Sequence, residues 1–496
     1  MDNELIWLLP AIGLVVALQP SYIHPDEHFQ TLEMLMIKFY GISGTVPWEF
    51  EPTNNARSYF PLYAFYGPLF YLMRDILKVQ NPLNILRIIR FYNFMLYLSV
   101  LYYALPKLVN ENKLQNKGRV NEALVFILSS YITWCYQCHS FSNSLETILL
   151  LLVLSNYTDI LSNKAGLLQL VSTGFLISVG TFTRISFPAF LLLPSIQVFL
   201  KVLYRKWIQM VVIAVSMTLS TSIIVYFDTF MYESDELIIA PLKNVVYNLN
   251  VDNLAKHGLH PRYTHLLVNI PLILGPGLLM IRNTKNDFLN LPLLSIISSL
   301  FFLSALRHQE LRFLLPVVPL FSTLLTRFRY RPYLFRIWLV FNAAMCIIMG
   351  IFHQGGVIPM ISNINAEQDL TIDIWWKTYS PPTWLYNNDI LTVSTTSIVN
   401  NIENLDLVQF NVETNHVVDL KGCDFDLVLE AIQNFRINGV KSLRLIVPNS
   451  MTSNVAALNQ TYLVTKENSV FPHLDLDHLD SGIQNIIGLS EYKVSL

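Results

Sequence analysis

Charge and cysteine are both scarce in this sequence. Asp, Glu, Lys and Arg make up only 14% of the 496 residues, and the formal net charge is -2. Without a basic excess the chain lacks the electrostatic field typical of nucleic-acid binding, so this class of partner is excluded. The 4 cysteines are too few for a disulfide scaffold, and Cys135 and Cys138 have no second pair or histidine cluster nearby to complete a zinc site. We expect both to be structural.

Apolar residues are abundant instead. Hydrophobic residues make up 53% of the chain and the mean hydropathy is +0.42, which indicates a bilayer as solvent. The apolar N-terminus, Leu5 to Leu18, follows acidic Asp2 and Glu4 and lacks the small-residue pattern of a signal-peptide cleavage site. It is predicted to be a retained first span, and its short length favours a thin membrane such as the endoplasmic reticulum.

Apolar windows recur along the first 352 residues. A helix needs about 20 apolar residues to cross a bilayer, and the windows predict about eleven spans. They lie near 5–21, 91–106, 121–138, 145–161, 167–183, 186–203, 207–227, 266–281, 288–305, 313–326 and 334–352.

Lys and Arg concentrate in alternate short loops, as in 107–119, 201–206 and 327–336. Such loops stay cytoplasmic, which fixes the expected orientation of every span. The remaining segments are therefore lumenal. These segments are 22–90, 139–144, 228–265, 306–312 and everything after 353.

The predicted fold is an all-α polytopic membrane protein with a small C-terminal α+β region. Residues 1–352 form the multispan domain, whose large first lumenal loop, 22–90, carries amphipathic stretches at 28–40 and 61–73. Residues 353–496 form the lumenal C-terminal region. Its strand-like pieces are 390–395, 405–412 and 442–447.

Two sequons occur in the chain. Asn459-Gln460-Thr461 lies in the tail and is open to glycosylation if the tail is lumenal. Asn156-Tyr157-Thr158 lies in or near a span, so we expect it to be unmodified.

The segment His24-Pro25-Asp26-Glu27 directly follows the first span. A carboxylate near the membrane surface loses contact with water, which raises its pKa and suits a general base. His24 or His28 would orient or tune that base. The alternative is that Asp26 is the N-cap of a helix over 28–40. The sequence leaves open whether Asp26 or Glu27 acts.

A second polar cluster, Arg307 to Arg312, lies between two apolar segments. Each charge would cost roughly 2.5–3.5 kcal/mol inside a membrane, so this density favours function. His308 and Arg312 are suited to hold a phosphate, with Glu310 beside them. The alternative is a solvated turn with a Glu310–Arg312 pair.

Further candidates lie at other lumenal positions. Arg184 and Asp228, at helix ends, are predicted either to bind substrate or to anchor the interface. His257, His260 and Arg262 lie in a loop that offers donors for sugar hydroxyls, whereas a metal there lacks acidic or cysteine partners.

Three tail tryptophans allow two interpretations. Trp375, Trp376 and Trp384 are suited to stack on a glycan, and packing at an interface explains them equally well.

Three of these elements together carry a family resemblance: His24-Pro25-Asp26-Glu27, the element Ser142 to Thr147 with Glu146, and the segment His308 to Phe313. They resemble the multispan mannosyltransferases that use dolichyl-phosphate mannose, glycosyltransferase family 22 of the GT-C fold group. The segments Ala56 to Pro61, with Arg57, and Asn253 to Arg262 are most similar to the branch that adds the fourth mannose to GPI precursors. Sister enzymes carry a Gly-Thr-x-Pro-like segment in place of residues 257–262.

The resemblance implies transfer of mannose from a β-linked donor to the 2-hydroxyl of the third mannose, giving an α-1,2 bond with inversion. It implies catalysis by Asp26 or Glu27, without cofactor or metal. It also implies an enzyme of the endoplasmic reticulum membrane whose only evident partners are the lipid-linked donor and the GPI precursor lipid. The residues assigned to substrate or phosphate binding are His24, His28, Arg57, Glu146, Arg184, Asp228, His257, His260, Arg262, His308, Glu310 and Arg312.

Three alternatives are weighed against this interpretation. A sister mannosyltransferase of third-mannose or N-glycan assembly shares the chemistry. A lipid transporter or scramblase usually carries charges at mid-span and internal repeats, whereas these charges lie at helix ends. A noncatalytic scaffold subunit would not depend on Asp26.

Overall fold

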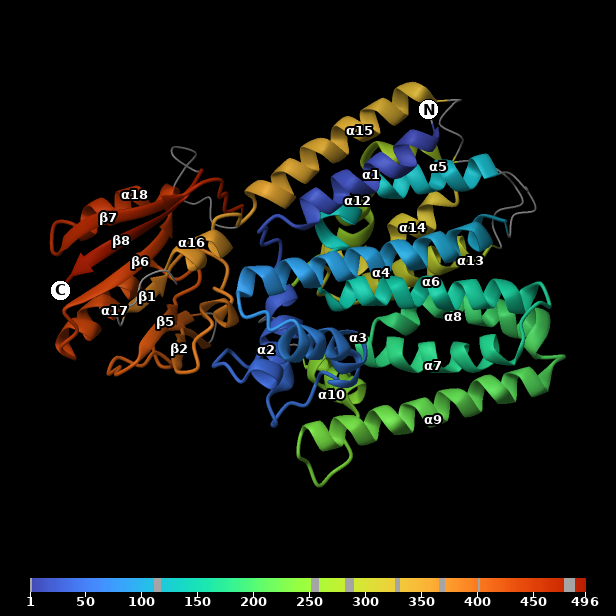
Figure 1. Cartoon of the computed structure of the whole chain (residues 1–496), viewed down its shortest axis with the longest axis horizontal. Helices are drawn as coiled ribbons and strands as arrows, with labels where there is room; N and C mark the ends of the chain where they lie inside the picture. The colour runs from blue at the N-terminus through green and yellow to red at the C-terminus, as the bar shows by residue number, and fades with distance from the viewer. Residues whose placement is uncertain are drawn as a thin grey trace. The chain divides into compact units, whose positions relative to one another are not determined.

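The computed structural model describes residues 2–110, 117–250, 258–281, 290–325, 331–364, 371–399, 402–476 and 487–496. The chain forms two compact units (Figure 1). The first unit comprises Met1–Ala17, Pro47–Leu69 and Ile89–Ala344, and the second comprises Leu18–Val46, Phe70–Ile88 and Met345–Leu496. Both units are therefore assembled from segments that are distant in the sequence.

The first unit is helical. Its helices are α1 (Asp2–Ala17), α5 (Lys117–Leu128), α6 (Ser142–Leu161), α7 (Leu167–Thr183), α8 (Phe187–Val198), α9 (Trp207–Met231), α10 (Ala240–Leu249), α12 (Ile270–Leu274), α13 (Leu291–Ala305) and α14 (Val317–Ser322). Three further helices, α3 (Phe60–Tyr71), α4 (Pro82–Asn110) and α15 (Pro332–Ile347), contribute residues to both units.

Shorter turns of helix extend or join these helices. They are η2 (Trp48–Phe50), η4 (Ile132–Tyr136), η5 (Phe199–Leu203), η6 (His265–Asn269), η7 (Gly275–Met280) and η8 (Leu311–Leu314). Each apolar window found in the sequence coincides with one or more of these helical elements in the described ranges.

Four described helical segments are long and apolar enough to cross a membrane: Pro82–Val109, Ser142–Leu161, Trp207–Met231 and Pro332–Phe352. Helices such as Leu167–Thr183 and Leu291–Ala305 are apolar but shorter. The total of about eleven spans stays a prediction.

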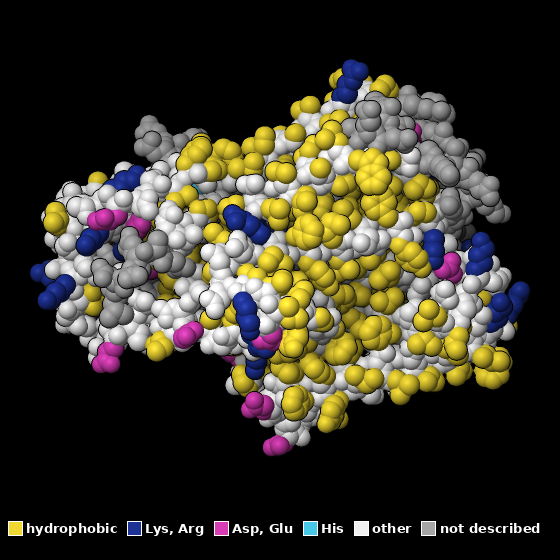
Figure 2. All heavy atoms as spheres, in the orientation of Figure 1, with side chains coloured by type: hydrophobic (Ala, Val, Ile, Leu, Met, Phe, Trp, Pro, Cys, Tyr) yellow, Lys and Arg dark blue, Asp and Glu magenta, His cyan; other side chains and the backbone are white. Residues whose placement is uncertain are grey.

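The surface of the helical unit is apolar where a soluble protein would be polar. Leu219, Ile223 and Tyr226 of α9 are 60%, 61% and 74% exposed. Figure 2 shows hydrophobic side chains covering much of the visible face of the helices. Such contiguous exposed apolar surface indicates contact with lipid.

Small residues let α7 and α9 pack closely. A Cβ added at Gly174 would lie 2.4 Å from the carbonyl oxygen of Ile213. The Ser178 hydroxyl donates to the carbonyl of Met217 at 2.9 Å, and the Ser216 hydroxyl donates to that of Val171 at 2.6 Å. Small residues and hydroxyls at a helix interface take over the role that hydrophobic burial has in water.

The second unit contains a six-stranded sheet in the order β2-β5-β1-β6-β8-β7. The strands are β1 (Ile372–Trp375), β2 (Leu391–Thr395), β5 (Asn415–Asp419), β6 (Ser442–Pro448), β7 (Leu463–Val470) and β8 (Leu489–Ser495). Strands β2, β5, β1 and β6 are parallel, whereas β8 pairs antiparallel with both β6 and β7. A separate pair joins β3 (Ser397–Val399) to β4 (Ile402–Asn404).

Helices complete the second unit. They are η1 (His28–Leu32), α2 (Glu33–Tyr40), η3 (Leu72–Ile76), η10 (Ile348–Phe352), α16 (Val357–Ile364), η11 (Thr383–Tyr386), α17 (Phe425–Ile437), η12 (Asn449–Met451) and α18 (Thr452–Leu458).

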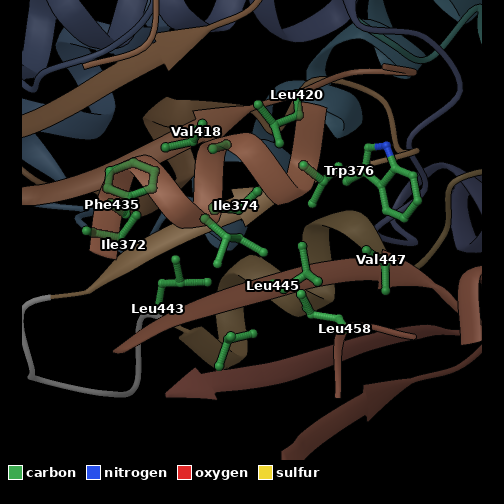
Figure 3. Close-up of a cluster of buried hydrophobic side chains, with 14 of the residues drawn as sticks. Ile372, Ile374, Trp376, Val418, Leu420, Phe435, Leu443, Leu445, Val447 and Leu458 are labelled. Atoms are coloured by element: carbon green, nitrogen blue, oxygen red, sulfur yellow. The ribbon is translucent and has the colours of Figure 1, made fainter. Parts of the chain in front are cut away.

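The core of the sheet forms where central strands pair in register. Ile374 of β1 lies opposite Val418 of β5 and Leu445 of β6, and all three side chains are fully buried with Phe435 of α17 (Figure 3). Parallel strands covered by a helix bury their side chains on that face, which explains these apolar runs.

Most, but not all, sequence-based predictions for this region are confirmed. Strands occur over 390–395 and 442–447, as predicted, and helices over 28–40 and 61–73. The strand predicted at 405–412 is wrong. There the Asn404 side chain accepts from the Asp406 N–H at 3.1 Å and Leu405 and Val408 are both buried, so a turn replaces the alternation that a strand requires.

Gly174→Val should separate α7 from α9, because the added side chain would overlap the backbone of α9. Overpacking of this kind costs about 1–3 kcal/mol, so the melting temperature in detergent should fall. Gly166→Val is the matched control, since a Cβ there meets only the flexible end of Gln169. Equal melting temperatures for the two variants would contradict the close approach.

Candidate active site

Asp26 lies in the first turn of the helix that continues into η1. Its carboxylate is 3.6 Å from Nδ1 of His24, and the two side chains are 19% and 29% exposed. Glu27, which directly precedes η1, makes no capping hydrogen bond with its side chain. The alternative that Asp26 caps this helix stays a prediction, and its carboxylate is partly exposed beside a histidine.

Glu27 and His28 have a different environment from Asp26. Both side chains are fully buried, with Oε2 of Glu27 lying 3.7 Å from Nε2 of His28. On the other side of the ring, the Trp384 indole N–H donates to Nδ1 of His28 at 3.1 Å. The motif thus presents one partly exposed carboxylate and one buried carboxylate.

Glu33, at the start of α2, is a residue that sequence analysis missed. Its fully buried carboxylate accepts from the Thr383 hydroxyl at 2.9 Å and from the Trp384 backbone N–H at 3.1 Å. Burial raises the pKa of Glu33 to about 8, against the opposing effect of these donors. This carboxylate ties the motif segment to the tail segment that contacts His28.

Tyr22 makes a second tie between the same segments. Its buried hydroxyl donates to the carbonyl of Ser380 at 2.6 Å, and the Ser380 hydroxyl donates to Asp419 at 2.6 Å. Asp419 is the last residue of β5, so the segment before Asp26 is attached to the carboxyl edge of the parallel strands.

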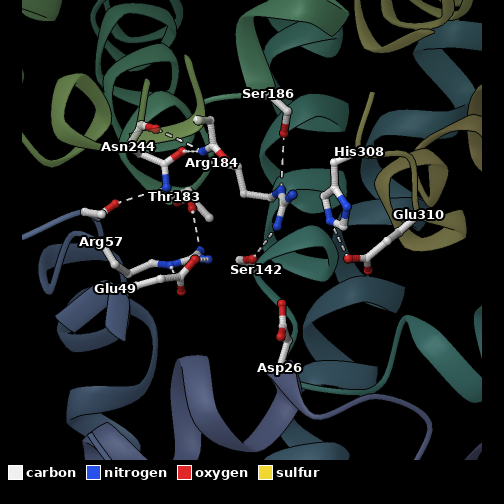
Figure 4. A network of polar contacts seen from close by, with 12 residues as sticks. Asp26, Glu49, Arg57, Ser142, Thr183, Arg184, Ser186, Asn244, His308 and Glu310 are labelled. Carbon is white, nitrogen blue, oxygen red and sulfur yellow. Dashed lines mark hydrogen bonds and ion pairs between the residues drawn. The ribbon is translucent and has the colours of Figure 1, made fainter. Parts of the chain in front are cut away.

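In the first unit, Arg184 and Glu146 form a buried network, and Figure 4 shows Arg184 with its partners Ser142 and Ser186. Nε of Arg184 lies 3.5 Å from Oε2 of Glu146, and Nη1 donates to the Ser142 hydroxyl at 2.9 Å. The Ser186 hydroxyl donates to the other Glu146 oxygen at 2.7 Å. Glu146 is fully buried and Arg184 only 12% exposed, so both charges are compensated away from bulk water.

His308, Glu310 and Arg312 form an adjoining cluster. Nδ1 of His308 lies 3.1 Å from the Gly258 carbonyl, and Nε2 lies 2.7 Å from Glu310. Burial lowers the pKa of His308, but the hydrogen bond and charge of Glu310 outweigh burial and raise it. Since both ring nitrogens face acceptors, the imidazolium form is favoured.

Arg312 also pairs with Glu310 and is only 7% exposed at its side chain. The Glu310–Arg312 pair of the alternative interpretation is therefore confirmed, although Arg312 is largely buried while Glu310 is 21% exposed. Two cations around one carboxylate leave an excess positive charge, which is suited to an anion such as a phosphate.

Phe313 connects the two networks. The Arg184 guanidinium lies 4.9 Å from the Phe313 ring centroid, and the Arg312 guanidinium lies 5.4 Å from it. Cation–π contacts hold each guanidinium plane against the ring. Sequence analysis included Phe313 only as the end of a motif, because nothing in the sequence indicates two cations around one ring.

Arg57 is held by an acidic partner. Its guanidinium binds both oxygens of Glu49, at 3.0 and 2.8 Å, and reaches the Thr183 carbonyl at 3.5 Å. The pair is about nine-tenths buried. These contacts make Arg57 an anchor between the first loop and the end of α7.

Asp228 is likewise a structural anchor by its contacts. One carboxylate oxygen accepts from the N–H groups of Tyr59 and Phe60 at 2.9 and 3.1 Å, which caps the start of α3 from a distant helix. Tyr232, at the end of the same helix as Asp228, donates to the Arg57 carbonyl at 2.6 Å.

The loop that follows α10 is organised by Gln309. Its side chain donates to the carbonyls of Arg262 and Leu306 at 3.3 and 2.8 Å and accepts from the His265 N–H at 2.8 Å. His260 accepts from the Gln309 N–H at 3.3 Å. The Arg262 side chain is exposed, and His257 lies outside the described residues.

The tryptophans proposed as glycan platforms do not face solvent. Trp375, Trp376 and Trp384 are 0%, 2% and 0% exposed, so the stacking hypothesis is wrong for all three. All three side chains are instead packed inside the second unit, and packing at an interface stays a prediction.

The described ranges contain no group of three or more His, Cys, Asp or Glu side chains arranged to hold a metal ion. The independence of the reaction from metals and cofactors stays a prediction.

A model of the Alg9-like mannosyltransferase family matches residues 4–388. The chain belongs to the Alg9-like mannosyltransferase family. It is therefore a glycosyltransferase, and the matched region contains every candidate residue described above. Membership of the Alg9-like mannosyltransferases gives no support to the transporter and scaffold alternatives.

Several proteins that share the same name are similar to this chain over its whole length. GPI mannosyltransferase 4 of Candida glabrata is 99% identical over 496 residues, covering 100% of both chains. GPI mannosyltransferase 4 of Saccharomyces cerevisiae is 42% identical, covering 99% of this chain and 98% of that one, and that of Eremothecium gossypii is 41% identical with the same coverage.

Solved structures show the fold that this Alg9-like chain shares. ArnT from Cupriavidus metallidurans bound to undecaprenyl phosphate has a TM-score of 0.55 at 10% identity, covering 99% of this chain and 98% of that one. Its apo state has a TM-score of 0.52 at 12% identity, covering 98% and 97%. The chain thus has a GT-C fold and is a multi-pass membrane protein.

The pKa of Glu33 generates a prediction about stability. Between about pH 4.5 and about pH 8 the folded state keeps a proton that the unfolded state has released, so the free energy of unfolding should fall as pH rises through this window. Glu33→Gln should flatten that slope and also lower stability by about 1–3 kcal/mol, because the amide cannot accept every donor. Melting temperatures across the window test this, and exposed Glu467→Gln should keep the wild-type slope.

Arg312→Lys should weaken anion binding without unfolding the protein. Lysine keeps the charge but loses the planar group that lies against Phe313 and pairs with Glu310. We expect kcat/KM for the mannose donor to fall about tenfold, equivalent to one charge-assisted hydrogen bond. Arg205→Lys, at an exposed position, should match the wild type, and so would Arg312→Lys if the cluster has no role in binding.

Proposed function

We propose that this enzyme transfers mannose from dolichyl-phosphate mannose to the third mannose of a GPI precursor, forming an α-1,2 bond. The observation that carries the proposal is full-length similarity to proteins named GPI mannosyltransferase 4, from 99% to 41% identity in three species. The GT-C fold and the clusters described above are compatible with a lipid-linked donor.

The reaction we propose is a single displacement with inversion. A base removes the proton from the acceptor 2-hydroxyl, and the resulting oxygen forms a bond to C1 of the donor mannose. The bond between C1 and the phosphate oxygen breaks, and its electron pair leaves with dolichyl phosphate. One base and one stabilised leaving group are sufficient for this step.

Asp26 is the base in this proposal. Its side chain is 19% exposed, whereas that of Glu27 is fully buried against His28. A general base needs hydrogen-bond reach to the hydroxyl that it deprotonates, and accessibility therefore favours Asp26. Glu27 and His28 are buried next to each other and hold the motif in place, and His24 lies beside the Asp26 carboxylate.

The cationic cluster is assigned to the leaving phosphate. His308 and Arg312 both contact Glu310, so a guanidinium and an imidazole with a raised pKa lie side by side. Phosphate oxygens gain negative charge as the C1–O bond breaks, and fixed cations stabilise that charge most where water is excluded. Arg184 is held nearby through Phe313 and is proposed to contribute to the same binding.

The remaining candidates are assigned to the acceptor side or to its support. His260 and Arg262 lie on the loop fixed by Gln309 and are proposed to bind sugar hydroxyls. Arg57 and Asp228 anchor the first loop through Glu49, Tyr59 and Phe60, so we propose that they position this loop rather than touch substrate.

We further propose that the enzyme resides in the endoplasmic reticulum membrane with its active site lumenal. The distribution of Lys and Arg among the loops and the short first span support this location. The donor lipid and the GPI precursor lipid would then enter from the bilayer, and the protein would require no other partner, cofactor or metal.

Asp26→Asn tests the base. An amide cannot take the hydroxyl proton, so kcat should fall by about 10²–10⁴-fold while the melting temperature stays near that of the wild type. The measurement is transfer of labelled mannose by membranes supplied with dolichyl-phosphate mannose and a three-mannose GPI precursor. Glu27→Gln should lose less activity, and exposed Asp406→Asn none.

The same assay separates the subfamilies. Membranes that form no four-mannose product but elongate a two-mannose GPI precursor or an N-glycan precursor would identify a sister enzyme. Full activity in both Asp26→Asn and Glu27→Gln would overturn the assignment of the base to this motif.

A further inference from the structure

The indole of Trp384 fixes the protonation of a ring in the proposed catalytic motif. Its N–H lies 3.1 Å from Nδ1 of His28. An indole nitrogen only donates, so Nδ1 must be the acceptor and carries no proton. The ring proton of neutral His28 is therefore on Nε2, because the partner of one nitrogen sets the tautomer.

The Nε2 side of His28 faces Glu27. The distance from Nε2 to the Glu27 carboxylate is 3.7 Å, and both side chains are fully buried. At this distance the protonated Nε2 set by Trp384 is an electrostatic neighbour, and not a hydrogen-bond donor, of the carboxylate that adjoins Asp26 in the sequence. A tautomer with the proton on Nδ1 would instead turn a lone pair toward Glu27.

The position of Trp384 is itself fixed. Its backbone N–H donates to both oxygens of Glu33 at 3.1 Å, and its ring is stacked on His28 with an interplanar angle of 29°. The indole is fully buried, so neither rotation nor water can replace the donor that His28 receives.

Other described groups around His28 have partners of their own. Tyr22 meets the His28 ring edge-on at a centroid distance of 5.0 Å, and its hydroxyl donates to the Ser380 carbonyl. Tyr379 lies against Tyr22, and Glu33 accepts from Thr383 and Trp384. The Glu27 carboxylate is the titratable partner that approaches Nε2 of His28, at 3.7 Å, within the described residues.

We propose that Trp384 is a positioning residue of the transfer reaction. By donating to Nδ1 it holds His28 as the neutral Nε2–H tautomer, and His28 in turn orients Glu27 beside the base. This inference rests on the proposed function of the Asp26 motif. It gives the C-terminal segment a role in catalysis that does not require contact with substrate.

Trp384→Phe removes the donor and preserves an aromatic ring at the stacked position. Nδ1 of His28 then lacks this donor and can bind a second proton as pH falls, which would place an imidazolium next to Glu27. The positive charge on His28 would attract the carboxylates of Glu27 and Asp26 and shift them from their positions in the motif. We expect kcat to fall about tenfold at neutral pH, as one lost hydrogen bond predicts, and more steeply at acidic pH.

The pH profile distinguishes positioning from a general loss of structure. Trp384→Phe should show an acid limb in kcat that the wild type lacks, with KM for the donor unchanged. In the background of His28→Asn, which cannot titrate, Trp384→Phe should add no acid limb. A uniform loss at every pH, or a profile equal to that of the wild type, would overturn the inference.

A matched control is available in the same unit. The Trp376 indole is also buried and donates to the Cys423 carbonyl at 2.8 Å, without contacting the motif. Trp376→Phe removes an equivalent hydrogen bond and should leave the pH profile unchanged. An acid limb in both variants would show that the effect comes from weakening the sheet and would overturn the inference.

A second measurement does not depend on Trp384→Phe folding. In the full-length protein labelled with ¹⁵N-histidine, with His28→Asn used for assignment, Nδ1 of His28 should have the chemical shift of an unprotonated nitrogen and Nε2 that of a protonated one. The opposite tautomer would overturn the inference.

The failure of this inference and that of the proposed function give different results. If Asp26→Asn and Glu27→Gln retain full transfer, the motif is not catalytic, whatever Trp384→Phe does. If Asp26→Asn is inactive but Trp384→Phe has the wild-type profile, the base assignment stands and only the role of Trp384 is lost.

Discussion

The arrangement of the second unit depends on one buried carboxylate. Glu33 is surrounded by donors from Thr383 and Trp384, two residues about 350 positions away in the chain. A polar carboxyl group without such donors would be costly to bury. The two segments must therefore come together for either to be stable. When the two segments join, Trp384 also comes into contact with His28. The burial of the Glu33 carboxyl group therefore determines the surroundings of the motif that contains Asp26.

Buried charged groups are also compensated by close partners in the helical unit. Glu146 and Glu310 each compensate an arginine that would otherwise be stranded in apolar surroundings. Phe313 lies against both guanidinium groups and so holds them by cation–π contacts. Buried ion pairs contribute little net stability but a great deal of orientation. What the unit gains is a preorganised set of cations, and preorganisation is what stabilises developing charge most effectively.

The sequence predicted much of this and missed the rest for identifiable reasons. Apolar windows predicted the helices because hydrophobic length is a local property, and the motif containing Asp26 was conspicuous for its charge beside a span. The contacts of Glu33, Trp384 and Phe313 are long-range, so no local pattern indicates them. The tryptophans were assigned either to a glycan platform or to an interface, because composition does not reveal which residues the fold buries. The pairing of Asn404 with the Asp406 N–H likewise replaced a strand that alternation alone had favoured.

The hydrogen bond from Tyr22 to Ser380, at the edge of the sheet, affects the order in which the protein can fold. The two residues are separated by 358 positions, and domains generally fold in the order of their synthesis. The segment around Asp26 is synthesised early, whereas Ser380, which binds Tyr22 of this segment, is synthesised late. The segment around Asp26 therefore lacks its partners while the membrane helices are inserted. A chain that ends before Ser380 would lack the acceptor of the Tyr22 hydroxyl.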